Sequence, residues 1–250
     1  MRYFIEFSYL GTDFMGFQIQ PNAKTVEGEL ENAMSKLLRQ SIDINGSSRT
    51  DTGVHAFQQF AHFDIENPID TSQLAYTLNK ILPKSIFIKR IFEVSDNIHA
   101  RFDAISRKYE YRILQQKNPF LQNQGYLFPS GLDLDLMNSA GEILMQNTDF
   151  QCFSKVNTQV NHFRCDIMEA FWKESENQLI FTIKADRFLR GMVRAIVGTM
   201  IEVGMMRTSL EKFESILKSK NRSEAGRAVP PQGLFLKEVN YPIGIFEVNP

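Results

Sequence analysis

The chain has 250 residues, of which 43% are hydrophobic and 23% are charged, a composition typical of a soluble globular protein with ample core. Its formal net charge of −1 does not favour nucleic-acid binding, so local basic clusters would have to supply any phosphate contacts. The two cysteines provide no disulfide framework and indicate a reducing compartment. No run approaches the roughly 18 apolar residues of a membrane span, and charges come too early for a signal peptide. We therefore expect a cytoplasmic protein.

Hydrophobic periodicity in the first hundred residues predicts the order strand, helix, strand, strand, helix, strand. Apolar side chains alternate with polar ones at residues 2–9, whereas from Val26 they recur at helical spacing, with Thr25 as a possible N-cap. The strands are expected at residues 2–9, 42–44, 57–65 and 86–94, and the helices at residues 26–38 and 71–81. This order is that of an α+β unit of ferredoxin-like type.

A second α+β half is expected to begin near Arg101, which divides the chain into residues 1–100 and 101–250. Its strands are expected at residues 109–113, 165–173, 179–185 and 234–239, and its helices at residues 133–145, 188–204 and 208–217. Thr208 and Glu211 have the spacing of a capping box at the start of the last helix. The two halves show no sequence repeat.

The polar loop at residues 45–56, between two predicted strands, is the first candidate site. Its glycines and serines allow sharp bends and a close approach of the backbone to a ligand. One residue separates Asp51 from Arg49, and a carboxylate beside a guanidinium at the tip of such a loop suits a binding or catalytic site. The alternative is an ordinary hairpin loop, in which the aspartate makes an Asx-turn and the arginine is solvated.

Two basic clusters follow later in the chain. Residues 99–112 contain four lysines or arginines and two acids among aromatic residues; cations suit phosphates, and rings stack on unpaired bases. Residues 184–207 contain five cations and two acids, with Arg187, Arg190 and Arg194 at helical spacing. Each cluster also has an ordinary explanation, as a strand with its charges outside and as a solvated helix face.

Together these segments resemble the TruA family of tRNA pseudouridine synthases, and the matches extend over nearly the whole chain. The family's G-R-T-D-x-G-V-H-A segment corresponds to residues 48–56, K/R-Y-x-Y to 108–111, F-L-x-x-M-V-R-x-I-V-G to 188–198 and A-x-G-L-x-L to 231–236. The segment from Gly11 to Gln18 and the one from Ile98 to Arg101 add to the resemblance. Ser48, Thr52 and Arg190 depart from the family pattern.

The resemblance implies the pseudouridine synthase fold, with two ferredoxin-like (RRM-like) halves whose antiparallel sheets flank a central basic cleft. It implies a homodimer that needs no cofactor or metal and isomerises uridine to pseudouridine at positions 38–40 of the tRNA anticodon stem-loop. Asp51 matches the catalytic carboxylate, Tyr109 the ring that stacks on the target uracil, and Arg194 the arginine that pairs with the aspartate. The residues expected to bind substrate are Arg49, Thr50, His55, Arg101, Lys108, Tyr109, Arg187 and Arg190.

Other functions are compatible with parts of the sequence. The departures at Ser48 and Thr52 allow a catalytically silent RNA-binding protein on the same scaffold. Asp51 also begins a D-T-G triplet like that of aspartic proteases, in which two carboxylates share one proton. Because the sequence has one such triplet, a protease of this type would have to be a dimer. The adjacent Arg49 favours an ionised aspartate and opposes such sharing. The spacing of Cys152, His162 and Cys165 contains no C-x-x-C pair, which many zinc sites have. We therefore expect these residues to be structural and not to bind a metal.

Overall fold

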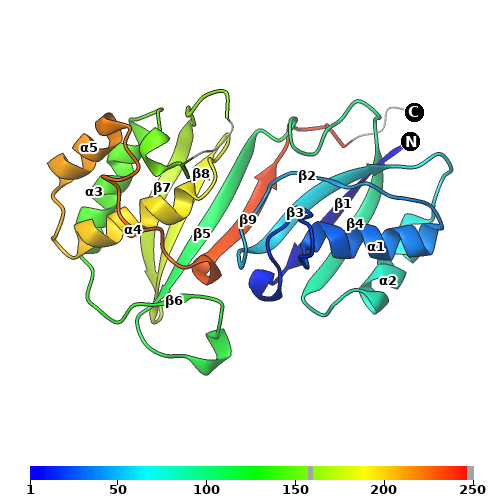
Figure 1. Ribbon diagram of the computed structural model, residues 1–250, viewed down its shortest axis with the longest axis horizontal. Helices are drawn as coiled ribbons and strands as arrows, with labels where there is room; N and C mark the ends of the chain where they lie inside the picture. Colours follow the sequence, from blue (N-terminus) through cyan, green and yellow to red (C-terminus); the bar gives the residue numbers. More distant parts are fainter. Residues whose placement is uncertain (157–159, 247–250) are drawn as a thin grey trace. The chain divides into compact units, whose positions relative to one another are not determined.

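The structure, a computed structural model, describes residues 1–156 and 160–246. Over these residues it is a mixed α+β fold with five α-helices and mostly antiparallel strands (Figure 1). Contacts within the chain group it into two compact units. The first contains Met1–Ile105 and the C-terminal residues from Leu236 on, and the second contains Ser106–Phe235. The last strand, β9 (Leu234–Asn240), therefore begins in the second unit and ends in the first.

The first unit follows the predicted order of strands and helices. Its elements are β1 (Arg2–Tyr9), α1 (Val26–Leu38), β2 (Asn45–Gly46), β3 (His55–Asp64), α2 (Thr71–Ile81) and β4 (Ile86–Val94). The central β1 pairs antiparallel with β4 on one side and β3 on the other, and β2 pairs with β3. Tyr3, Ile5 and Phe7 alternate along β1 and are at most 2% exposed, as expected for one buried face of a strand.

Local signals in the sequence explain where the helices of this unit begin. The Thr25 side chain accepts a hydrogen bond from the Gly28 amide at the start of α1, and Asp70 accepts one from Gln73 at the start of α2. The predicted cap at Thr25 is confirmed, as are the bounds of both helices and of the strands β1 and β4.

The strand predicted at residues 42–44 is wrong, because only Asn45–Gly46 of this segment pairs with β3. Ile42 and Ile44 are buried, but their amides donate to side chains of α1 instead of to a neighbouring strand. The Ile42 amide donates to the Ser35 hydroxyl at 3.0 Å, and the Ile44 amide donates to a Glu31 carboxylate oxygen at 2.8 Å. The alternation of apolar residues here reflects burial beside a helix.

The second unit also combines antiparallel strands with helices. Its elements are β5 (Ser106–Leu114), β6 (Tyr126–Leu127), α3 (Leu134–Met145), β7 (Ile167–Ser175), β8 (Gln178–Ala185), α4 (Met192–Gly204) and α5 (Leu210–Ser219). β8 lies between β5 and β7 and pairs antiparallel with both, whereas β6 runs parallel to the end of β5. Helix α3 packs against β7 and α4 (Figure 1).

Two predicted helix starts in the second unit are corrected by the structure. Helix α4 begins at Met192 rather than at residue 188, because Gly191 has a φ of 72°, a left-handed conformation that ends the preceding turn. Arg187 and Arg190 therefore precede the helix, and only Arg194 of the three arginines lies on it. Helix α5 is capped by Ser209, whose hydroxyl accepts from the Lys212 amide, and not by Thr208.

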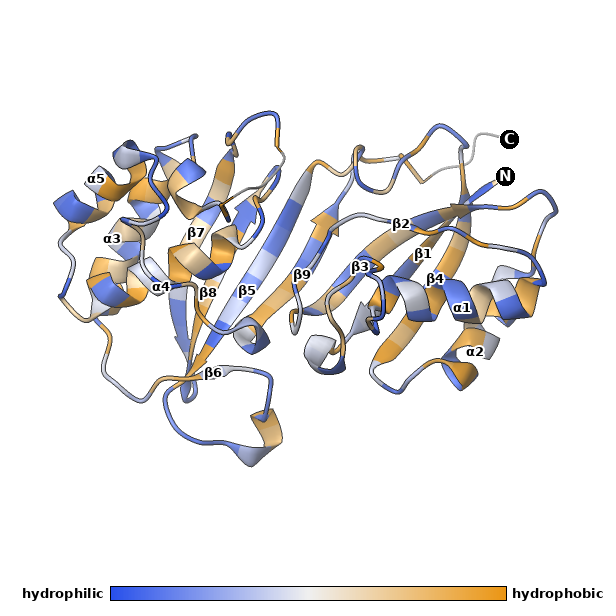
Figure 2. Ribbon diagram, viewed as in Figure 1, coloured by the Kyte–Doolittle hydropathy of each residue, from blue (hydrophilic) through white to orange (hydrophobic). Residues whose placement is uncertain are grey.

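The hydropathy colouring agrees with this packing. Figure 2 shows long hydrophobic stretches along β1, β3 and β4, and hydrophilic residues alternating with hydrophobic ones along α1. On the opposite face of β1 from Tyr3, the Phe4 ring meets Tyr241 and Phe246, so the C-terminal residues cover part of the sheet in the first unit. None of the helices in the described ranges is long and apolar enough to cross a membrane.

Candidate active site

The candidate loop that carries Asp51 connects β2 to β3 in the first unit. The two strands pair at Asn45 with His62 and at Gly46 with Ala61, and the Ser47 amide extends the ladder with a 2.7 Å bond to the Phe60 carbonyl. Beyond this point the chain leaves the sheet. Asp51 is half-buried, and the Val54 amide closes a turn by donating to its carbonyl at 3.1 Å. The hairpin thus places Asp51 at the tip of a short excursion from the sheet.

The segment that follows β1 supports this loop through its backbone. The Phe17 amide donates to the Thr50 carbonyl at 3.1 Å, and the Gly53 amide donates to the Phe14 carbonyl at 3.3 Å. Gly16 has a φ of 96°, and a Cβ atom there would lie 2.9 Å from the Thr50 carbonyl oxygen. Such a close approach of two backbones requires glycine. The glycines of the Gly11–Gln18 segment therefore serve the position of the Asp51 loop.

Three buried side chains hold the loop from other directions. The Tyr9 hydroxyl lies 2.7 Å from the Thr50 hydroxyl. His55, which is 1% exposed, accepts a 3.0 Å hydrogen bond from the Gly11 amide through Nδ1. Gln59 is fully buried; its oxygen accepts from the Ser47 hydroxyl at 2.6 Å. The predicted substrate-binding residues Thr50 and His55 thus have partners inside the protein.

The same Gln59 side chain also reaches the backbone of the loop. Its amide nitrogen donates to the Ser48 carbonyl at 2.7 Å. Ser48, which replaces the glycine usual in the family, is 9% exposed, whereas Thr52, the other small departure beside Asp51, is exposed. The loop accommodates both residues with its hydrogen bonds in place.

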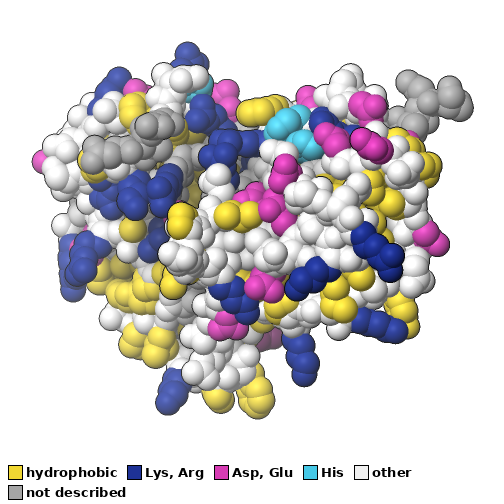
Figure 3. All heavy atoms as spheres, turned by 45° about the vertical axis from the view of Figure 1, so that its right-hand side comes forward, with side chains coloured by type: hydrophobic (Ala, Val, Ile, Leu, Met, Phe, Trp, Pro, Cys, Tyr) yellow, Lys and Arg dark blue, Asp and Glu magenta, His cyan; other side chains and the backbone are white. Residues whose placement is uncertain are grey.

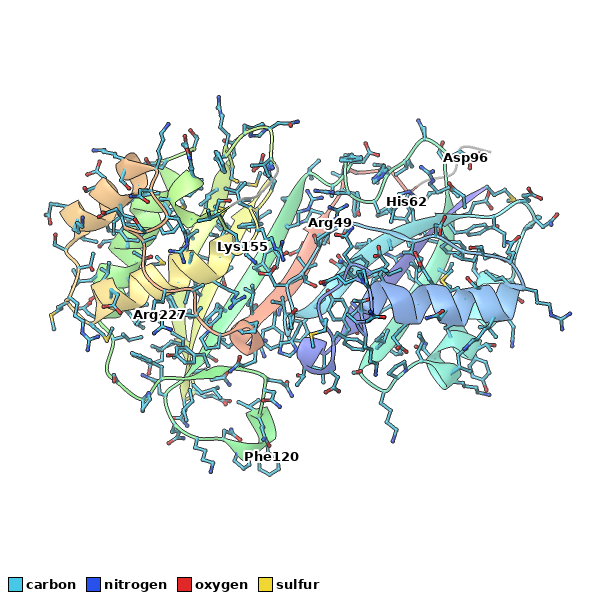
Figure 4. All side chains as sticks on the ribbon, in the orientation of Figure 1. Arg49, His62, Asp96, Phe120, Lys155 and Arg227 are labelled. Carbon is cyan, nitrogen blue, oxygen red and sulfur yellow. The ribbon has the colours of Figure 1, made fainter. Side chains whose placement is uncertain are left out.

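Arg49 is exposed on this loop, whereas Thr50 beside it is buried (Figure 4). The charge of Arg49 acts on Glu27, which lies on the first turn of α1. Burial raises the pKa of Glu27, while the hydrogen bond that it accepts from the Ile19 amide and the charge of Arg49 act in the opposite direction. The loop therefore presents a guanidinium at its surface, two residues before a half-buried carboxylate.

The second unit holds Tyr109 and Lys108 on β5. Tyr109 pairs across the sheet with Ile183, is 8% exposed, and meets the Phe188 ring edge-to-face at 5.0 Å. The ring is thus held in one orientation by its neighbours. Lys108 points to the other face of the strand, where its ammonium lies 3.1 Å from a Glu169 carboxylate oxygen.

Arg194 lies on the first turn of α4 and is tied to the chain that follows α5. Its Nε donates to the Val229 carbonyl at 2.7 Å, and the Val229 amide donates back to the Arg194 carbonyl at 3.1 Å. These two bonds fix both the backbone and the guanidinium. Arg194 belongs to the second unit and Asp51 to the first, so their pairing stays a prediction.

The other two arginines of the basic cluster occupy the turn before α4. A terminal nitrogen of Arg187 lies 3.1 Å from His162 Nε2, and the Arg187 amide donates to the Asp186 carboxylate at 2.7 Å. Arg190 is exposed, and its carbonyl accepts from the amide of Lys155 (Figure 4). The cations of this cluster are thus presented from a turn and a helix start, not from one helical face.

Arg101, from the basic cluster at residues 99–112, lies in the first unit, in the turn after β4. Arg101 is exposed there, next to His99. The His99 ring lies 4.5 Å from His62, whose Nδ1 accepts from the Ala100 amide at 3.2 Å. Burial, followed by the nearby charges of Arg2 and His99, lowers the pKa of His62 to about 4. His62 is therefore neutral at neutral pH.

Several residues of the candidate site are not among those that sequence reasoning selected. Gln59, Tyr9 and His62 lie on strands, where the period predicts only which face a residue takes. What could identify them is a polar side chain at a strand position that is expected to be buried. Gln59 is 0% exposed and His62 is 3% exposed. Buried polar groups are nearly always hydrogen-bonded, and here they bond to the candidate loop and to the turn that carries Arg101.

Both cysteines are buried as free thiols. Burial raises the pKa of both Cys152 and Cys165 to about 12, which keeps the thiols protonated. The Cys165 sulfur packs 3.9 Å from the sulfur of Met192. Among residues 1–156 and 160–246, no group of three or more histidine, cysteine or acidic side chains is placed to hold a metal ion.

Comparisons with known proteins assign the family. A family model described as tRNA pseudouridine synthase matches residues 6–103 and 147–242. The tRNA pseudouridine synthase A of Parabacteroides distasonis is 46% identical over 99% of both chains, and that of Azobacteroides pseudotrichonymphae is 47% identical over 98% of this chain and 99% of its own. The tRNA pseudouridine synthase A of Staphylococcus aureus is 34% identical over 96% of this chain and 91% of its own.

These matches cover the Asp51 loop, the Tyr109 strand and the start of α4 within single full-length alignments. The chain belongs to the TruA family of tRNA pseudouridine synthases.

Proposed function

We propose that this chain isomerises uridine to pseudouridine at positions 38–40 of the tRNA anticodon stem-loop, with Asp51 as the catalytic carboxylate. The observation that carries the proposal is the geometry of the Asp51 loop. The loop is anchored by buried side chains and by the Gly11–Gln18 segment, yet it leaves Arg49 exposed and Asp51 half-buried. A carboxylate fixed in this way suits chemistry, because a positioned group needs no reorganisation during reaction.

The reaction explains the kinds of residue involved. The bond between N1 of uracil and C1′ of ribose breaks, the base turns, and a bond forms between C5 and C1′. The C5 proton is lost and N1 gains one, so reactant and product have the same atoms and no redox cofactor is required. Asp51 acts either as a nucleophile at C1′ or as a base at the sugar. Both routes need an ionised carboxylate.

The remaining residues are assigned to holding the substrate. Tyr109 retains the detached uracil by stacking, and Arg194 orients Asp51 through its planar guanidinium. Paired or stacked bases must leave the helix to react, and Arg49 would fill the space that they leave. The cations assigned to the tRNA backbone are Arg101, Lys108, Arg187 and Arg190. Thr50 and His55 serve the same loop through their internal hydrogen bonds.

We also propose that the chain has two ferredoxin-like halves, forms a homodimer and is located in the cytoplasm. The order strand, helix, strand, strand, helix, strand in residues 2–94 supports the first of them, since it is the ferredoxin-like order. Size-exclusion chromatography with light scattering tests the dimer directly.

The activity is tested by tritium release from tRNA labelled at C5 of uridine. We expect wild type to release tritium and Asp51→Asn to release none, with tRNA affinity nearly unchanged because no phosphate contact is lost. Asp43→Asn, an exposed aspartate shortly before the loop, is the matched control and should be fully active. Wild type that binds tRNA without release would indicate a silent RNA-binding protein. Substantial turnover by Asp51→Asn would remove Asp51 from the catalytic role.

A further inference from the structure

The turn after β4 exposes an aromatic ring, Phe102, that belongs to the basic cluster at residues 99–112. Phe102 is 74% exposed, although it directly follows Arg101 in a turn with regular hydrogen bonds. A single exposed apolar side chain needs no explanation by itself. The surroundings of Phe102 distinguish it from such a case, because its ring is the outer end of a continuous series of aromatic contacts.

Four rings form this series, which runs from the core of the first unit to its surface. Phe4 is fully buried and stacks on His62 at a centroid distance of 6.0 Å. His62 meets His99 at 4.5 Å, and His99 meets Phe102 at 4.2 Å. Figure 4 marks His62 on β3, and Figure 3 shows histidine atoms reaching the surface among basic and acidic side chains. We call these four residues the ring column.

Hydrogen bonds fix the turn on which the outer rings lie. The His99 amide donates to the Asp103 carboxylate at 2.6 Å, and the Asp103 amide donates to the His99 carbonyl at 3.1 Å. The Arg101 amide donates to His99 Nδ1 at 3.0 Å. The Tyr241 hydroxyl donates to the Ala100 carbonyl. The backbone of this turn therefore has little freedom left to lose when a ligand binds the exposed ring.

The charges around the ring column indicate what kind of ligand suits it. Arg2 and Asp64 form a two-pronged ion pair, with both nitrogen-to-oxygen distances at 2.8 Å. Burial is the main cause that lowers the pKa of His99 as well as that of His62, so both imidazoles are neutral at neutral pH. The Arg101 guanidinium lies 5.8 Å from the Phe102 ring centroid. The surface thus offers one aromatic face with one cation beside it.

We propose that Phe102 is a stacking platform for an unpaired nucleotide of the tRNA, with Arg101 next to the phosphate of that nucleotide. The proposal rests on the proposed function, which supplies the RNA. A rigid exposed ring beside a cation is the combination with which proteins hold unpaired bases. A protein partner is disfavoured, because protein interfaces need a contiguous apolar patch and the residues on either side of Phe102 are the charged Arg101 and Asp103.

The first test compares tRNA affinity among three variants. Removing a stacked ring should weaken binding about 10-fold or more in Phe102→Ala, while Phe102→Trp should bind at least as tightly as wild type. The slope of affinity against salt should not change in Phe102→Ala, since no charge is lost. Phe120→Ala is the matched control, because Phe120 is even more exposed at 89% and should not alter affinity (Figure 4).

The second test detects stacking directly. The chain has one native tryptophan, Trp172, which is 4% exposed, so a tryptophan at position 102 should dominate any change in fluorescence. We expect tRNA to quench Phe102→Trp in the Asp51→Asn background, where no turnover occurs. Wild-type affinity in Phe102→Ala together with unquenched Phe102→Trp would overturn the platform and leave the proposed function standing. Failure of the proposed function is seen separately, as wild type that neither binds tRNA nor releases tritium, and it would overturn both.

Discussion

The side-chain amide of Gln59 donates a 2.7 Å hydrogen bond to the backbone carbonyl of Ser48 and so fixes the chain three residues before Asp51. The same side chain accepts from the Ser47 hydroxyl, so one buried amide satisfies two groups at the start of the loop. A fully buried strand residue thereby helps to hold the backbone that leads to the candidate carboxylate. The role of Gln59 is positional, and it can be separated from catalysis by experiment.

Gln59→Met keeps the approximate volume but removes the two hydrogen bonds that the Gln59 side chain makes with the Ser47 hydroxyl and the Ser48 carbonyl. We expect the free energy of unfolding to fall by about 1–3 kcal/mol, since buried hydrogen bonds are lost without replacement by water. The single-turnover rate should fall about 10- to 100-fold while tRNA affinity stays near wild type, because a small displacement of a reacting group costs that much. Denaturant unfolding, rapid-quench kinetics and filter binding measure the three quantities. The control Gln73→Met, on the surface of α2, should change none of these quantities. An unchanged rate in Gln59→Met would show that Gln59 does not position the loop.

Gly16→Ala tests the support that comes from the segment after β1. The added Cβ atom would approach the Thr50 carbonyl to 2.9 Å, and the φ of 96° is unfavourable for any residue with a side chain. We expect a destabilisation of more than about 1 kcal/mol and a loss of rate. Gly131→Ala is the control, because a Cβ atom there meets nothing within 4 Å. Equal stability and rate in the two variants would show that the segment and the loop are not coupled.

Arg194→Lys keeps the positive charge but cannot reproduce a planar guanidinium with its Nε bound to the Val229 carbonyl. If Arg194 orients Asp51, the single-turnover rate should fall far more than tRNA affinity. Arg187→Ala and Arg190→Ala should instead weaken affinity and reduce its salt dependence by about one ion each. Rates and affinities across several salt concentrations distinguish these outcomes. If Arg194→Lys is as fast as wild type, Arg194 does not orient Asp51 and is only a phosphate contact.

His62 should make stability depend on pH. Because burial lowers its pKa to about 4 in the folded state, the unfolded chain binds the proton more readily between the ordinary histidine value and pH 4. The stabilising contribution is therefore complete at neutral pH and is lost as the pH falls through this window. Denaturant unfolding at several pH values should show a flatter dependence in His62→Gln. His162→Gln, at an exposed position, should keep the wild-type dependence, and an unchanged profile in His62→Gln would refute the assignment.

The sequence predicted those elements whose signals are local. Helix α1 carries its own cap at Thr25 and an apolar face of helical period, and β1 alternates regularly, so their bounds follow from neighbouring residues alone. The predicted start of α4 is wrong because the arginine spacing continues the helical period through Gly191, which has a left-handed conformation in the structure. The helix propensity of the individual residues does not show where the helix begins.

The features that needed tertiary information could not be predicted. Ile42 and Ile44 alternate like strand residues, yet their amides bind Ser35 and Glu31 of α1. The return of the chain to the first unit at Leu236 also has no signal in the residues of β9. In the candidate site, Asp51 was selected by its motif. The supporting residues Tyr9 and Gln59 were not selected, because their roles depend on contacts with residues distant in the sequence.

The hydrogen bonds between the Gly11–Gln18 segment and the loop run in both directions, from Phe17 to Thr50 and from Gly53 to Phe14. Neither segment can therefore shift alone without breaking bonds on both sides of Asp51, and the two must fold and unfold as one cooperative piece. Under the proposed function, the Asp51 loop therefore stays in place and the target uridine swings out of the RNA helix to reach it.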